Sequence, residues 1–103
     1  MVICLHAQGE EIYHGFRGVY PEGSEKIAEA MAKVSGYALA EPSGTASFGG
    51  MKDWFTHKFS RPGFTVEVGK GKNPIPEEQL SEIEERLCPA IEKAMLTYEE
   101  VLC

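Results

Sequence analysis

Two short runs of nonpolar and β-branched residues limit what this chain can fold into. Residues 2–5 are nonpolar without interruption, and residues 64–68 are mostly so. Because a strand with one wet face alternates polar and nonpolar residues, an unbroken nonpolar run predicts a strand covered on both faces. We therefore expect residues 2–5 to form a central strand between helical layers. This strand would present His6 at its carboxyl end.

Helical spacing accounts for three other segments. Nonpolar residues repeat at helical intervals after Ser24, which can cap a helix that Gly36 would end. A short amphipathic helix is expected over residues 51–59, and a longer one starting near residue 76 or 77. Pro89 interrupts the nonpolar stripe of the last helix, so we expect a kink or a break there.

The remaining segments complete an α/β prediction. Residues 11–16 predict a second strand, for which an antiparallel partner is plausible, and residues 37–50 have the composition of a loop. Strands alternating with helices predict a short mixed β-sheet of about three strands with helices packed against it. The length of 103 residues predicts a single domain over residues 1–103.

Charge and cysteine content narrow the function classes. Sixteen Asp and Glu against ten Lys and Arg give a formal net charge of -6, which argues against a nucleic-acid or anionic-membrane binder. No stretch is nonpolar enough to span a bilayer, and the first run is too short for a signal peptide, so a cytoplasmic location is expected. The three cysteines form no Cys-x-x-Cys pair, which favours reduced thiols.

His6 and Glu67 are the residues best suited to carry chemistry. A strand-end imidazole is held rigidly, as a metal ligand must be, although it could also only hydrogen-bond a loop. Glu67 in a buried strand would need a partner, a proton or a metal-activated water; alternatively it shares an exposed face with Thr65. Together the two fit a zinc hydrolase in which His6 holds the metal and Glu67 takes a proton from bound water.

Four segments occur in the order found in a known family: LHAQGEEIY around His6, SGTASFGGMKDWF, RPGFTVEVGKGKNPIP around Glu67, and EEQL. They resemble the zinc carboxypeptidases of the carboxypeptidase A type. These segments are most similar to those of the bacterial branch that cleaves γ-D-glutamyl-diaminopimelate bonds in peptidoglycan peptides. The likeness covers nearly the whole chain, which looks like the final third of the usual catalytic domain.

The resemblance implies roles for individual residues. His6 matches the third zinc ligand, and Glu67 the general base and acid. Lys52 matches a position that lines the specificity pocket, where a lysine suits a peptide substrate with an acidic C-terminal residue; alternatively Lys52 is a solvated helix lysine. The family's mobile substrate-binding tyrosine falls on Thr45, so that contact is lost unless Tyr37 substitutes.

Parts of the family's site are missing from this sequence. The first two zinc ligands come from a His-x-x-Glu motif, which none of the three histidines begins. Because catalytic zinc normally needs three protein ligands, we expect zinc only where another chain adds ligands, such as an upstream half of the peptidase. A site rebuilt from Glu10, Glu11, His14 or His57 is the alternative within the chain.

Two functions therefore stay open. The chain is either part of a zinc-dependent peptidase that is inactive alone, or a non-catalytic peptide-binding or assembly module derived from one. A partial sheet would leave an unpaired edge strand, and unpaired backbone groups favour pairing with another chain. A homo-oligomer is expected in both cases.

Overall fold

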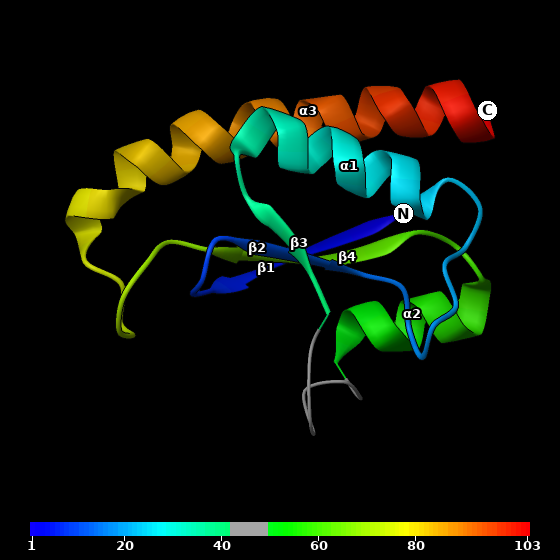
Figure 1. Ribbon diagram of the computed structural model, residues 1–103, viewed down its shortest axis with the longest axis horizontal. Coiled ribbons are helices and arrows are strands. Elements are labelled where there is room, and N and C mark those ends of the chain that lie inside the picture. Colours follow the sequence, from blue (N-terminus) through cyan, green and yellow to red (C-terminus); the bar gives the residue numbers. More distant parts are fainter. Residues whose placement is uncertain (42–49) are drawn as a thin grey trace.

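Helices cover both faces of a four-stranded mixed sheet in the computed structural model, which describes residues 1–41 and 50–103 (Figure 1). The elements in chain order are β1 (Val2–Ala7), β2 (Glu11–His14), α1 (Ser24–Ser35), β3 (Ala38–Ala40), α2 (Met51–Phe59), β4 (Gly63–Val68), the 3-10 helix η2 (Glu77–Gln79) and α3 (Leu80–Leu102). Helices α1 and α3 pack against each other on one face of the sheet, and α2 lies on the other. The expected α/β class is confirmed.

The strand order is β1-β4-β2-β3. Strand β4 runs parallel to β1 and antiparallel to β2, and β3 runs parallel to β2. Two expectations are corrected here. The segment expected to be a loop contains the short strand β3, and within the described residues β1 is an edge strand rather than a central one, with Leu5 52% exposed.

The hydrophobic core lies between the sheet and the α1–α3 layer. Alternate residues of the strands point into it, so Phe64 and Val66 of β4 and Ile12 of β2 are at most 1% exposed. The helices contribute Ile27, Ala28, Met31, Leu87, Ala90 and Ala94. The residues between these strand positions must therefore face the opposite side, where α2 lies.

Two features of the helices differ from the sequence-based expectation, one at the start of α1 and one inside α3. Gly36 ends α1 with φ 79°, as expected, but Gly23 precedes the helix and the Ser24 side chain makes no capping hydrogen bond. A Cβ on Gly23 would lie 2.9 Å from Val101 Cγ2, so the start of α1 packs closely on the end of α3. Of the kink or break expected at Pro89, the break is absent, since α3 continues through this residue. Pro89 and Glu85 are exposed, so water can hydrate the carbonyl that the proline leaves without an amide donor.

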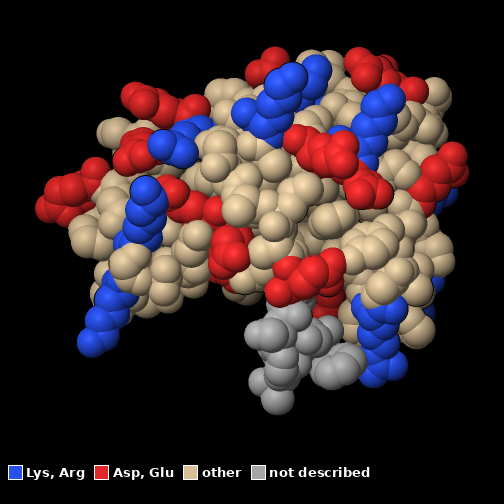
Figure 2. Space-filling model, in the orientation of Figure 1, with Lys and Arg blue, Asp and Glu red and all other residues tan. Residues whose placement is uncertain are grey.

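Charged side chains of both signs are interspersed over the side of the molecule formed by α1 and α3 (Figure 2). Within residues 1–41 and 50–103, no helix combines the length and the nonpolar character needed to cross a membrane.

Candidate functional site

The strand register brings His6, Glu67 and Glu11 into one row across three strands. His6 of β1 is paired with Glu67 of β4, and Glu67 is paired with Glu11 of β2. Residues directly opposite one another on neighbouring strands project to the same face of a sheet. These three residues, here called the polar row, therefore lie on the face away from the core. The structure thus brings together the two residues that the sequence pairs, and adds Glu11.

A second row lies beside the polar row on the same face. Cys4, Thr65 and Tyr13 are its members, again by register. The Tyr13 hydroxyl donates a hydrogen bond to Glu11 Oε1 at 3.3 Å, which connects the two rows. Burial raises the pKa of the Cys4 thiol, against an opposing effect of the Lys52 charge, so the thiol form is favoured at neutral pH.

Glu67 is half-buried, and its surroundings favour the protonated carboxyl. Burial raises its pKa above the ordinary value, and the neighbouring Glu11 carboxylate adds to this rise. The His6 imidazole acts in the opposite direction. A carboxyl whose pKa moves toward neutrality can both accept and release a proton, which is the requirement for general acid–base catalysis.

Two loops frame the polar row and are tied to each other. The Gly9 amide donates to the Gly69 carbonyl at 2.8 Å, and Asn73 Nδ2 donates to the Ala7 carbonyl at 3.2 Å. Lys70 and Gln79 exchange two hydrogen bonds of 2.9 Å between the Lys70 backbone and the Gln79 side-chain amide. These contacts fix the ends of β1 and β4, where His6 and Glu67 lie.

Lys52 is buried near the start of α2 and is not a solvated helix lysine. Its ammonium nitrogen donates to the Gly15 carbonyl at 2.7 Å and lies 2.6 Å from Asp53 Oδ1. Lys52 and Asp53 are 6% and 4% exposed, so the pair is removed from water. The role in substrate binding implied for Lys52 stays a prediction.

The other predicted contacts are placed as follows. Thr45 lies outside the described residues. Tyr37 is 3% exposed and its hydroxyl is buried, so it is not positioned to replace a substrate-binding tyrosine on the surface.

Three zinc ligands do not come together within the part of the chain that the structure describes. No three His, Cys, Asp or Glu side chains in residues 1–41 and 50–103 converge as a metal site would require. His14 ends β2 and packs on Tyr20 with ring centroids 4.9 Å apart, whereas His57 of α2 faces the Phe16 ring at 6.0 Å. The site rebuilt from these histidines is therefore wrong, and the described residues by themselves do not fit a three-ligand zinc centre.

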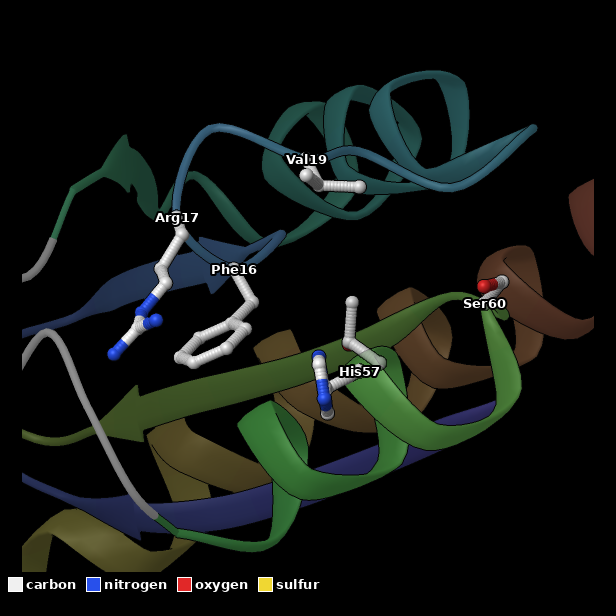
Figure 3. Close-up of a pocket in the computed structure, with 6 residues that line it drawn as sticks. Phe16, Arg17, Val19, His57 and Ser60 are labelled. Atoms are coloured by element: carbon white, nitrogen blue, oxygen red, sulfur yellow. The ribbon is translucent and has the colours of Figure 1, made fainter.

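A cavity of about 240 Å³ was not indicated by any sequence pattern. It lies between the turn after β2 and the second half of α2, and Phe16 and His57 approach each other across it (Figure 3). The Arg17 guanidinium stands 5.2 Å from the centroid of the Phe16 ring. The cavity adjoins the end of β2, whereas Glu11 begins that strand, so it is separate from the polar row.

His14 should make the stability of the fold depend on pH. Burial lowers the pKa of His14 below 6.5, while Glu41 and Glu25 partly oppose this shift. The folded chain then binds the proton less tightly than the unfolded chain, so stability is fully present above about pH 6.5 and falls as the pH drops toward the folded-state pKa. His14 can change the free energy of unfolding by at most about 1.4 kcal/mol per pH unit, the limit for one proton.

Thermal unfolding of the native chain and of His14→Gln between pH 7.5 and 5 measures this effect. The difference in melting temperature between the two should narrow as the pH falls, and the exposed His57→Gln should follow the native chain. Parallel pH profiles for the native chain and His14→Gln would rule out the assignment.

Comparison with known proteins gives two partial relatives. The chain is 42% identical over 82 residues to the uncharacterized protein YqgT of Bacillus subtilis (strain 168), which covers 80% of this chain and 22% of that protein. It is 47% identical over 76 residues to gamma-D-glutamyl-L-diamino acid endopeptidase 1 of Lysinibacillus sphaericus, or 73% of this chain and 18% of that protein. The chain thus spans about a fifth of the length of these relatives. No protein-family model and no solved structure matches it.

Proposed function

We propose that this chain, a homologue of a named endopeptidase over 73% of its own length, has a peptidase-related function centred on the polar row. The register that puts His6 beside Glu67 carries the proposal, because it joins an imidazole and a carboxyl on one face of the sheet. The proposed ligand is a peptide containing a γ-D-glutamyl-diamino acid bond, with an acidic C-terminal residue.

Glu67 is the proposed proton carrier for hydrolysis. Its carboxylate would take a proton from the attacking water as the water oxygen bonds to the peptide carbonyl carbon. The same carboxyl would then give that proton to the leaving amine as the carbon–nitrogen bond breaks. The raised pKa of Glu67 supports both halves of this exchange.

Zinc dependence is proposed only for an assembly in which another chain contributes ligands. His6 would then be one ligand among several, since catalytic zinc sites normally use three protein ligands. The upstream half of a peptidase is one such partner. The chain alone is therefore expected not to hydrolyse the peptide.

Lys52 is proposed to contribute to the recognition of the acidic end of the peptide through its charge. Its ammonium is held by Asp53 and by the Gly15 carbonyl, so direct contact with the ligand would require the ammonium to leave these partners. A lysine freed in this way would complement an acidic group by its charge.

A non-catalytic peptide-binding module is the second candidate. It is favoured by the observation that no three metal-ligating side chains converge among residues 1–41 and 50–103. In this candidate the polar row still binds the peptide, but Glu67 transfers no proton.

Calorimetric titration of the full chain with a γ-D-glutamyl-diaminopimelate peptide tests the proposal, with free amine measured in the same samples. We expect binding and no hydrolysis. His6→Ala and Glu11→Ala should each weaken binding by about 10-fold, the effect of one lost hydrogen bond to a charged group. The exposed His57→Gln is the matched control. The absence of binding would contradict the proposal.

Glu67→Gln separates the two candidates. If any hydrolysis is measured with added zinc, the variant should lose it by about 100-fold or more while it still binds the peptide. Hydrolysis that survives in Glu67→Gln would exclude Glu67 as the proton carrier. Binding that is equal in both proteins, with no hydrolysis in either even when zinc and an upstream half of a peptidase are added, would favour the module.

A further inference from the structure

Glu11 forms the end of the polar row on β2. Its side chain is half-buried, and its Oε1 accepts a hydrogen bond of 3.3 Å from the Tyr13 hydroxyl. Within residues 1–41 and 50–103, no Lys, Arg or His side chain forms an ion pair with Glu11. The neighbouring Glu10 differs, since its Oε1 lies 3.4 Å from the Lys70 ammonium. The charge of Glu11 is therefore available to a positively charged ligand.

Two neighbours hold the Glu11 carboxylate in place. A Cβ on Gly9 would lie 3.1 Å from Glu11 Oε1, so the glycine leaves the carboxylate the room that it occupies. Burial raises the pKa of the Tyr13 hydroxyl, and the Glu11 carboxylate adds to this rise, so Tyr13 remains a hydrogen-bond donor. A carboxylate accepts hydrogen bonds at both of its oxygens. Tyr13 holds one oxygen of Glu11, and the other remains for a ligand.

The position of Glu11 opposite Glu67 also favours a cation. The two residues face each other directly across β2 and β4. Like charges in directly opposite positions on neighbouring strands destabilise a sheet. A positively charged group between the two carboxyl groups would remove this repulsion. Because neighbouring strands are about 4.8 Å apart, a group bound at Glu11 lies one strand away from the proposed proton carrier.

We propose that Glu11 is the specificity residue that binds the side-chain ammonium of the diamino acid. This inference rests on the proposed function and names the group of the peptide that the polar row selects. The second ammonium distinguishes a diamino acid from nonpolar and acidic residues, and it pairs with a carboxylate through charge-assisted hydrogen bonds. When the γ-glutamyl bond lies beside Glu67, the carbon chain of the diamino acid can carry this ammonium across one strand spacing to Glu11.

Calorimetric titration of the full chain with two peptides tests the proposal. One is γ-D-glutamyl-diaminopimelate, and the other is γ-D-glutamyl-aminopimelate, which lacks only the distal ammonium and keeps the distal carboxylate. The native chain should bind the diaminopimelate peptide at least about 10-fold more tightly, the effect of one hydrogen bond to a charged group. Glu11→Gln keeps the shape of the side chain but not its charge, so it should bind the two peptides with nearly equal affinity.

Glu10→Gln is the matched control. It removes one negative charge from the residue next to Glu11, but that charge is already paired with Lys70. Glu10→Gln should therefore prefer the diaminopimelate peptide by the same factor as the native chain. A preference lost in both variants would mean that the general negative charge of this loop attracts the peptide, and would overturn the assignment to Glu11. Melting temperatures of the three proteins show that each is folded in the titration.

The same titration separates a failure of this inference from a failure of the proposed function. Equal affinity of the native chain for the two peptides, or a preference that persists in Glu11→Gln, would overturn the role of Glu11 and leave the proposed function in place. If the native chain binds neither peptide, the proposed function is wrong and this inference falls with it. The native chain alone provides one of these tests, so the outcome does not depend on the folding of a variant.

Discussion

Replacing Lys52 by alanine should lower the free energy of unfolding by about 3–5 kcal/mol, because it leaves a buried charge without its partner. Asp53 is 4% exposed and its Oδ1 lies 2.6 Å from the Lys52 ammonium. The change also removes the donor to the Gly15 carbonyl. For a domain of this size, such a loss corresponds to a fall in melting temperature of about 12 °C or more.

Thermal and urea unfolding measure the effect. Lys58→Ala is the matched control, since Lys58 is an exposed lysine on the same helix and its loss should change stability by at most about 0.5 kcal/mol. Lys52→Met combined with Asp53→Leu should recover much of the loss, because no unpaired charge then remains buried. Equal stabilities of Lys52→Ala and Lys58→Ala would mean that Lys52 is solvated. Any loss of peptide binding by Lys52→Ala must be measured on folded protein.

Phe64→Ala should cost about 3–5 kcal/mol, the range for removing a fully buried aromatic side chain. Phe64 is 0% exposed and belongs to the core cluster between the sheet and α1 and α3. The same alternation along β4 that buries Phe64 and Val66 turns Thr65 and Glu67 to the opposite face. The prediction therefore tests the orientation of the strand that carries Glu67.

Thr65→Ala is the control for this prediction. Thr65 is the next residue of β4 and is half-buried on the opposite face, so its truncation should cost less than about 1.5 kcal/mol. Urea unfolding of both variants gives the comparison. A larger loss for Thr65→Ala than for Phe64→Ala would reverse the orientation of β4.

Sequence patterns were sufficient for elements whose periodicity is long or strong. The helix over Met51–Phe59 and the strand ending at Val68 match their expected positions. Strand β3 was missed because its three residues, Ala38–Ala40, are too few to show a period. The edge position of β1 was also missed, since a nonpolar run reports nonpolar surroundings but not which strand lies beside it.

The candidate site was only partly predictable from the sequence. His6 and Glu67 stand out by residue type within strand patterns, but Glu11 enters the row only through the order β1-β4-β2. That order is set by tertiary packing, which one sequence does not display. The burial of Lys52 was missed because lysines on amphipathic helices are usually solvated; the adjacent Asp53 was the available signal of a pair.

The central claim is that the polar row is where a γ-D-glutamyl-diamino acid peptide binds. Backbone amide NMR of the isotope-labelled full chain, titrated with such a peptide, measures this most directly. The account predicts that the largest shift changes occur at His6, Glu11 and Glu67 and in the two loops that frame them. Shift changes confined to the cavity between Phe16 and His57, with the amides of the row unmoved, would contradict it.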